Sequence, residues 1–481
     1  MKKILTVFIS LLIIFLASVP TSADGYTKSP YNSYNYDEWG KAIYSTDGYV
    51  PEKLIYSDVE NSIRIKNPKD FYIDDDGNFY ILNGKSEGVL ILDKNYRLIK
   101  NITVFNYGER GKFSLSDPMG IFVKDKVIYI ADKGSKEVLI CDINGEVLNT
   151  LTKPQSEMFP QQKEFLPTKV LADDLGNIFV IVEGVYEGAV CFDKNYKFVE
   201  FFGSNTVVAS ASVILQRFWR NFMTEDQREY TAGIVPTEYT GFDIDKEGFI
   251  YSCTAVGSGK TNQLRKLNPL GNNVYPQKTY GDLENIYIKG KSTETSFVDV
   301  SINEDDMLYA LDSAMGRIFV YDSDGQEIFI FGGKSEQMGG FDQPVAIDSF
   351  DNRLYVLDSS RSSITSFVLS QYGELVYDAT LSYVNGKYTE SADLWHKVLR
   401  QNENNSLAYV GIGKALYYQG DYDGAREYFK LGGNREQESA TFTVWRKAFL
   451  RKALMIVIPI VVLIVIITIV LIKVLKRRRK Q

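Results

Sequence analysis

The chain of 481 residues is long enough for more than one domain, and its 44% apolar and 13% aromatic residues exclude a mainly disordered protein. Its 61 acidic residues outnumber the 54 basic ones, and nucleic acid repels a negatively charged chain, so nucleic acid is excluded as a partner. The three cysteines, Cys141, Cys191 and Cys253, are too few for a disulfide framework or a zinc site and predict buried free thiols.

The first 23 residues have the pattern of a secretory signal peptide. A basic start is followed by the apolar run Ile4–Val19 and by small residues suited to cleavage after Ala23. An uncleaved anchor is the alternative, and in either case the domain that follows leaves the cytoplasm. Residues 24–40 are rich in Tyr, Asn and Ser, which predicts an extended N-terminal segment.

Between residues 41 and 370 one strand-and-turn pattern recurs six times. Short β-branched and aromatic runs separated by Asp, Asn and Gly turns predict antiparallel hairpins. The copies align on an aromatic anchor in the second strand: Tyr80, Tyr129, Phe179, Tyr251, Tyr309 and Tyr355. Copies of about 50 residues predict four-stranded blades repeated around an axis. We expect a strand within residues 41–57 to complete the last blade, because a closed ring leaves no long bare edge.

The copies at residues 118–148, 297–328 and 344–367 resemble the NHL-repeat family of six-bladed β-propellers. The resemblance covers residues 40–375 and implies a fold more than an activity. Some similar propellers, the gluconolactonase-like enzymes, bind calcium at the axis and hydrolyse lactones there. The resemblance therefore implies one alternative function, a calcium-dependent lactonase-like hydrolase.

An Asn or Asp residue lies three positions after the anchor in four of the six copies. We expect these residues to ring the mouth of the central channel, where carboxylates can hold a calcium ion. Val182 and Thr254 interrupt the ring, and a local role, in which each side chain braces a neighbouring loop, is favoured over metal binding. The ring residues are Asn83, Asp132, Asp312 and Asp358.

The chain has no motif that predicts catalysis. Its only histidine, His396, lies outside the repeats, and neither a Gly-x-Ser-x-Gly sequence nor a phosphate-binding loop is present. We predict no catalytic residue, no cofactor apart from the calcium alternative, and a protein that is not an enzyme.

An insertion at about residues 205–236 separates the third and fourth copies. Its apolar side chains recur at helical spacing, which predicts an amphipathic helix. This helix either packs on the propeller as a lid or strut or forms a docking surface. The docking alternative is based on its Arg, Trp and Phe residues, which are enriched at interface hot spots. The interaction candidates in this segment are Arg217, Phe218, Trp219 and Arg220.

Residues 371–436 change to helical periodicity and contain two similar units. Gly386, Tyr388, Ser391 and Trp395 are matched 34 residues later by Gly420, Tyr422, Ala425 and Phe429. Thirty-four residues is the tetratricopeptide period, and the second unit resembles that family, with Tyr409 and Tyr422 at signature positions. Both tyrosines are interaction candidates. A stalk and a peptide-binding groove are both open, and we favour a stalk with some docking capacity.

The C-terminal end predicts a membrane anchor. After a juxtamembrane helix at 437–452, residues 453–472 carry no charge, and 20 residues at ~1.5 Å each cross a hydrocarbon layer of ~30 Å. The basic tail at 473–481 holds six positive residues against four just before the span, which places the tail in the cytoplasm. Without the basic residues of the signal and of the segment from Arg446 onward, 42 basic and 61 acidic residues remain, a net charge of −19 outside.

We therefore predict a mainly β protein: a six-bladed β-propeller, a short tetratricopeptide-like helical domain and one transmembrane helix. It is a single-pass protein of the plasma membrane with an extracytoplasmic N-terminal domain, and the lack of disulfides indicates a bacterial source. We expect a binding or scaffold role toward a protein, a carbohydrate or another small molecule. Chains of this layout resemble accessory proteins of carbohydrate import systems in Gram-positive bacteria, which implies a transporter complex as partner.

Overall fold

The structure is a computed structural model that describes residues 29–37, 39–58, 63–108, 111–203, 238–255, 262–283, 286–288 and 291–478. The signal peptide lies outside these residues. So does the insertion at 205–236 with its four candidates Arg217, Phe218, Trp219 and Arg220.

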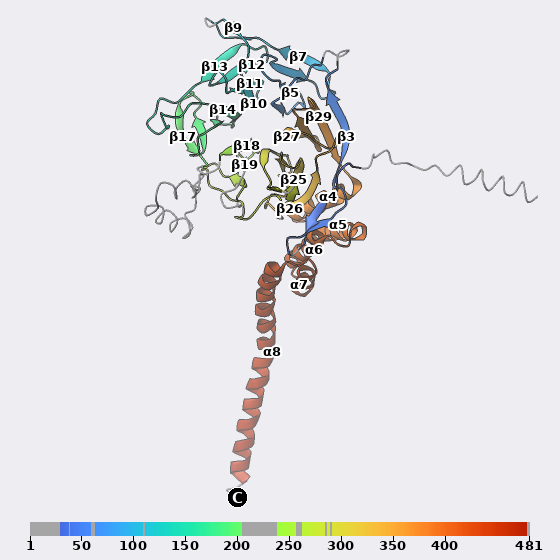
Figure 1. Ribbon diagram of the computed structural model, residues 1–481. Helices are drawn as coiled ribbons and strands as arrows, with labels where there is room; N and C mark the ends of the chain where they lie inside the picture. Colours follow the sequence, from blue (N-terminus) through green and yellow to red (C-terminus); the bar gives the residue numbers. More distant parts are fainter. Residues whose placement is uncertain are drawn as a thin grey trace, which may run out of the picture.

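Six antiparallel sheets surround a central axis, as Figure 1 shows. The innermost strand of each sheet contacts the innermost strands of both neighbours, so the ring is closed. The first blade contains β4 (Asp70–Ile73), β5 (Phe79–Leu82), β6 (Val89–Leu92) and β7 (Leu98–Ile102). The second contains β10 (Pro118–Lys124), β11 (Val127–Asp132), β12 (Glu137–Asp142) and β13 (Val147–Leu151). The third contains β14 (Pro167–Ala172), β15 (Ile178–Val182), β16 (Ala189–Phe192) and β17 (Phe198–Phe202).

The remaining blades are less regular. The fourth has three strands among the described residues, β18 (Tyr239–Ile244), β19 (Ile250–Thr254) and β20 (Leu264–Leu267). The fifth contains β23 (Phe297–Ile302), β24 (Leu308–Asp312), β25 (Arg317–Tyr321) and β26 (Glu327–Gly332), extended by β1 (Tyr34–Tyr36) and β2 (Ala42–Tyr44). The sixth contains β27 (Pro344–Phe350), β28 (Arg353–Asp358), β29 (Ser363–Leu369) and β3 (Tyr49–Tyr56). Two small hairpins complete the β structure: β8 (Phe105–Asn106) with β9 (Lys112–Phe113), and β21 (Ile286–Ile288) with β22 (Lys291–Thr293).

An N-terminal strand closes the ring, as predicted. β3 pairs with β29 from Tyr49 opposite Leu369 to Tyr56 opposite Ser363. The earlier part of the predicted closing segment behaves differently, because β2 pairs with β1, and β1 joins β26 of the fifth blade. Asp282 explains this placement, since its buried carboxylate accepts hydrogen bonds from both tyrosine hydroxyls of β1.

The acidic turns are hairpin turns. Asp74 Oδ1 accepts hydrogen bonds from the backbone N–H of Asp76 at 3.1 Å and of Asn78 at 2.8 Å. Gly77 completes the turn at φ +81°, a left-handed conformation that favours glycine. The turn that begins at Asp173 repeats these bonds. Their local bonding explains why Asp and Gly recur where each blade reverses direction.

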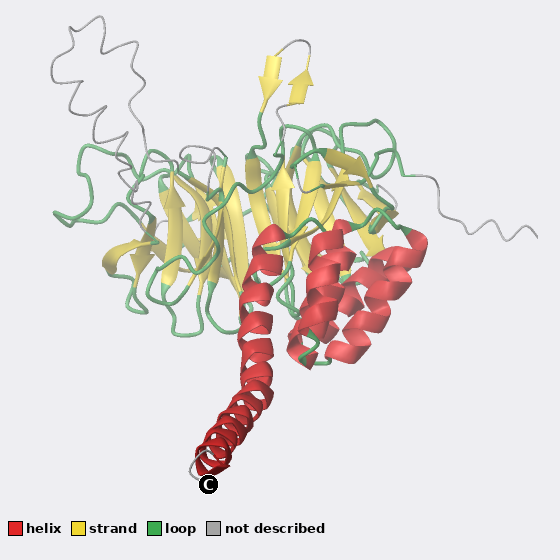
Figure 2. Cartoon of the chain, turned by 90° about the horizontal axis from the view of Figure 1, so that it is seen from below, coloured by secondary structure: helices red, strands yellow, loops and turns green. Residues whose placement is uncertain are grey.

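Four helices follow the propeller, namely α4 (Gln371–Val384), α5 (Tyr388–Gln401), α6 (Ser406–Gln419) and α7 (Tyr422–Leu431). Each packs on the next, so they form two antiparallel pairs. The glycines of α6 allow close packing on both of its neighbours: Gly411 leaves room for the Trp395 ring of α5, and Gly413 leaves room for the Phe429 ring of α7. Tyr372 and Val376 of α4 are buried in one apolar cluster with Phe331 of the fifth blade. Figure 2 shows these helices in red along one side of the yellow blades.

The last helix, α8 (Arg435–Arg478), is one continuous helix of 44 residues, about 66 Å long. It joins the predicted juxtamembrane helix and the predicted span without a break, and Pro459 lies within it. Among the described residues it alone is long and apolar enough to cross a membrane, and the apolar side chains of that stretch are exposed. The fold is therefore a mainly β propeller followed by five helices, the last of which is a candidate span. The three cysteines are free and buried, as predicted.

Candidate functional site

Two layers of side chains line the axis of the propeller. On the innermost strand of each blade, the residue that pairs with the aromatic anchor belongs to what we call the lower layer. The residue two positions earlier belongs to the upper layer. Both face the axis, because alternate residues of a strand share one face. The lower layer is Tyr72, Phe122, Leu171, Asp243, Ser301 and Asp348. The upper layer is Asp70, Gly120, Lys169, Gly241, Asp299 and Ala346.

An ion triad closes the upper layer. Lys169 Nζ lies 2.8 Å from Asp70 Oδ1 and 3.0 Å from Asp299 Oδ1, which joins the first, third and fifth blades across the axis. The three blades between them carry Gly or Ala, and a Cβ on Gly241 would lie 2.6 Å from Asp299 Oδ1. Burial raises the pKa of both aspartates, and the ammonium opposes that shift. Charged and small residues therefore alternate because the charged ones need the space.

Two further aspartates lie below the triad without a cation of their own. Asp348 Oδ2 accepts a hydrogen bond from the Ile73 backbone N–H at 2.7 Å, and Asp243 Oδ2 accepts one from the Ile302 N–H at 2.8 Å. Burial raises the pKa of both carboxyls, and the negative charge of Asp243 raises that of Asp348 further. These bonds hold the carboxyls in place but leave their charge uncompensated.

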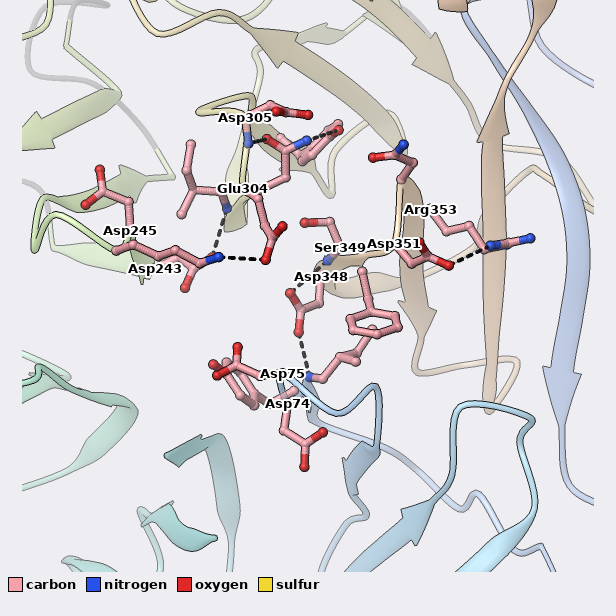
Figure 3. Close-up of a pocket in the computed structure, with 18 of the residues that line it drawn as sticks. Asp74, Asp75, Asp243, Asp245, Glu304, Asp305, Asp348, Ser349, Asp351 and Arg353 are labelled. Carbon is pink, nitrogen blue, oxygen red and sulfur yellow. Dashed lines mark hydrogen bonds and ion pairs between the residues drawn. The ribbon is translucent and has the colours of Figure 1, made fainter. Parts of the chain in front are cut away.

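Three residues of the lower layer, Tyr72, Asp243 and Asp348, line an acidic cavity of about 370 Å³, shown in Figure 3. Its walls are the turns between the first and second strands of the first, fourth, fifth and sixth blades. Two cations line it, Lys246, which pairs with Glu304 at 2.7 Å, and Arg353, which lies 3.6 Å from Asp351. Eight carboxylates line it: Asp74, Asp75, Asp243, Asp245, Glu304, Asp305, Asp348 and Asp351. We call this cavity the acidic mouth.

The acidic mouth opens on the side of the helical segment. The Tyr377 hydroxyl of α4 donates a hydrogen bond to Asp305 Oδ2 at 2.6 Å and accepts one from Asn303 Nδ2 at 2.8 Å. Asn303 and Asp305 belong to the wall of the mouth. The first helix after the propeller therefore contacts the wall of the cavity through Tyr377.

The predicted ring lies at the other end of the channel, and its four side chains are buried within their own blades. Asp132 accepts hydrogen bonds from the N–H groups of Ser116 at 2.9 Å and Asp117 at 2.7 Å, in the loop that leads into the same blade. The other three are bonded in the same way: Asn83 to the N–H of Lys66 at 2.9 Å, Asp312 to that of Ser296 at 2.8 Å, and Asp358 to that of Asp342 at 2.6 Å.

The bonding of the ring residues decides how well they fit calcium. Their oxygens already accept backbone hydrogens, and no group of three or more His, Cys, Asp or Glu in the described part of the chain is placed to hold a metal ion. These residues therefore do not fit a calcium site at this rim. They match the alternative in which each side chain braces a loop.

The two candidate tyrosines of the helical segment are not brought together. Tyr409 lies in the first turn of α6, with its ring centroid 6.4 Å from that of Tyr428. Tyr422 begins α7 at the opposite end of the pair, 5.5 Å from the Tyr417 ring. His396 packs against Tyr428 in the helical segment, away from the channel.

Comparisons with known proteins give the fold alone. No family model and no curated protein matches the chain. Virginiamycin B lyase from Staphylococcus aureus is 9% identical with a TM-score of 0.41, over 67% of this chain and 100% of the lyase. A streptogramin B lyase structure is 11% identical with a TM-score of 0.42, over 68% and 100%. A Bacteroides caccae protein of unknown function is 10% identical with a TM-score of 0.34, over 64% and 92%. Similarity this low gives no information on activity.

Proposed function

We propose that the protein is a membrane-anchored binding or scaffold protein whose acidic mouth binds a basic segment of a protein partner outside the cytoplasm. The observation that carries this proposal is the mouth itself, where eight carboxylates and only two cations share one cavity. A concave surface of one charge raises the local concentration of the opposite charge and speeds its association.

The floor of the mouth supports a cationic ligand in particular. Asp243 and Asp348 are bonded to backbone N–H groups, and neither forms an ion pair among the described residues. An ammonium or guanidinium group brought to them would lower the raised pKa of both carboxyls and stabilise their ionised form. The carboxyls of the cavity lining offer a surface for a cation, and binding is the function that we propose for it.

The proposed topology follows from the two ends of the chain. The signal at 1–23 exports the propeller, the apolar part of α8 anchors it in the plasma membrane, and the basic tail stays in the cytoplasm. In this arrangement the NHL-like propeller stands on two tetratricopeptide-like helix pairs. Both family assignments belong to the proposal, and so does a carbohydrate transporter as the partner complex.

Peptide binding to the full-length protein in detergent micelles tests the proposal. A short Lys-rich peptide should bind, a Glu-rich peptide of equal length should not, and affinity should fall as ionic strength rises. A triple variant of the mouth, D75N/E304Q/D351N, should weaken binding strongly. A triple variant of exposed acids on the third blade and in the loop that leads into it, E157Q/E187Q/E200Q, changes net charge equally and should not. Equal losses in both variants would show that net charge alone, and not the mouth, attracts the peptide.

Pull-down of the solubilised protein tests the partner class. Recovery of a transporter or another membrane component supports the scaffold role, and recovery of neither counts against it. The calcium-dependent hydrolase is separable in the same preparation, because calcium that binds the folded state raises the melting temperature. No calcium-dependent shift leaves the hydrolase without a mechanism.

A further inference from the structure

A second cavity lies between the propeller and the helices. Its volume is about 600 Å³, within the range of small-molecule sites, which occur preferentially at domain interfaces. Its lining residues come from β1, β26, α6 and the beginning of α8, among other segments. We call it the neck cleft. Its lining includes Tyr36 of β1, Lys278, Tyr321, Glu327, Leu407 and Val410 of α6, and residues 432–436 at the start of α8.

Glu327 and Lys278, two of the charged residues that line the neck cleft, form no ion pair among the described residues. Asp37, Arg435 and Glu436 also line the cleft. Glu327, at the start of β26, is partly exposed to the cleft, and its carboxylate forms neither a hydrogen bond nor an ion pair with any described residue. The Lys278 ammonium lies 5.2 Å from the centre of the Tyr280 ring and also forms no ion pair within 4.0 Å in the described chain. The cleft therefore separates an acid and a base that do not reach each other.

The electrostatics of the two groups show that both are poorly solvated. Burial raises the pKa of Glu327 to about 8, and the nearby Lys278 charge opposes this shift. Burial lowers the pKa of Lys278, and the charges of Glu327 and Asp322 oppose that shift. A charge held away from water without a partner is unfavourable, so a ligand that supplies both partners would be stabilised at both ends.

The rest of the cleft adds an apolar wall and polar groups. Tyr321, Leu407 and Val410 offer apolar surface, and Asn35, Gln326 and Asn434 offer amides as donors and acceptors. Ligand sites commonly combine an apolar lining with a few polar groups that fix orientation. This composition suits a small molecule with one apolar side group and two opposite charges.

We propose that the neck cleft binds a zwitterionic ligand of the α-amino acid class, with its ammonium toward Glu327 and its carboxylate toward Lys278. The apolar wall receives the side chain of the ligand. The site is separate from the acidic mouth and does not depend on a basic partner there. The start of α8 forms one wall of the cleft. Only the inference that the ligand binds next to a membrane anchor rests on the proposed function.

Thermal unfolding of the full-length protein in micelles, with each of the common free α-amino acids in turn, tests this site. A binding amino acid should raise the melting temperature in a saturable way. Its N-acetyl and amide derivatives, which lack one charge each, should bind about ten- to a hundredfold more weakly. The variants E327Q and K278M should each lower affinity by a similar factor, and their circular dichroism verifies folding.

Matched variants on the third blade, E200Q and K194M, should leave amino acid binding unchanged. If no free amino acid shifts the melting temperature or gives a calorimetric signal, the proposal is wrong. It is also wrong if binding survives in both E327Q and K278M. Binding of the Lys-rich peptide to the mouth should be unaffected by either cleft variant, so failure here and failure at the mouth are distinguishable.

Discussion

The two ends of the propeller channel use aspartate in opposite ways. At the rim, Asp132 and Asp358 are buried, and their oxygens accept backbone hydrogens of the loop that leads into the same blade. At the mouth, Asp243 and Asp348 accept backbone hydrogens from neighbouring blades and also face an open acidic cavity. The same side chain therefore holds one blade together at the rim and supplies a charged surface at the mouth. The hydrogen-bond partners of these aspartates, and not the residue type, distinguish the structural aspartates of the rim from the candidate binding residues of the mouth.

The largest effect should come from the ion triad between the two ends. Lys169→Met leaves Asp70 and Asp299 buried without a cation, and breaking a buried pair costs about 3–5 kcal/mol. Because the folded-state pKa of both aspartates lies above the unfolded value, this destabilisation should be small near pH 4 and grow as pH rises through the folded pKa. Urea unfolding at several pH values measures it, and a loss that is independent of pH would contradict this account.

A rim variant should have the next largest effect. Asp132→Ala removes the buried carboxylate that accepts hydrogen bonds from the N–H groups of Ser116, which is exposed, and of Asp117, which is partly buried. Donors that reach water lose less than fully buried ones, so we expect a loss of about 1–2 kcal/mol in the free energy of unfolding. Peptide binding at the mouth should persist while the protein stays folded. An unchanged unfolding free energy would show that the rim aspartate is not structural.

A mouth variant should act in the opposite direction. Asp348→Asn keeps an acceptor for the Ile73 N–H and removes a desolvated negative charge beside Asp243. We expect a gain of about 1 kcal/mol at pH 8, because a raised folded pKa makes the charged form unfavourable. Because the pKa of Asp348 is raised in the folded state, the wild-type protein loses stability as pH rises through that pKa. Asp348→Asn should therefore make the free energy of unfolding less dependent on pH. A variant that is less stable than the wild type at pH 8 would contradict this prediction.

The smallest effect on stability should come from the outer edge of the mouth. Glu304→Gln breaks the ion pair with Lys246. The side chain of Glu304 is 82% exposed and that of Lys246 is 76% exposed. Exposed ion pairs contribute little, so the melting temperature should not change. Affinity for the Lys-rich peptide should still fall, most clearly at low salt. A clear drop in melting temperature together with unchanged peptide affinity would show that Glu304 stabilises the fold and does not contribute to peptide binding.

The blades could be predicted from the sequence, whereas the axis could not. Aromatic anchors and Asp/Gly turns recur because each hairpin needs them at the same place. The axial residues lie opposite those anchors, but the turn between them varies in length. Asp243 precedes its anchor Tyr251 by eight residues, while Asp348 precedes Tyr355 by seven, so a fixed spacing does not find them.

The rim residues show a second limit of sequence reasoning. The spacing from the anchor identified Asn83, Asp132, Asp312 and Asp358 as one set, and the structure places them at one end of the blades. Sequence does not show which groups their oxygens contact, and that contact decides between a metal ring and four loop braces. The helical segment is easier to predict, because each of its helices packs on its neighbour in the sequence, as Gly411 of α6 does on Trp395 of α5.

The unbroken length of α8 has a mechanical consequence. A bilayer that is thinner than the apolar stretch makes such a helix lean over. No loop separates this stretch from the first turn of α8, which borders the neck cleft. In the proposed anchoring, a change in the tilt of α8 would therefore also change the orientation of the propeller relative to the membrane.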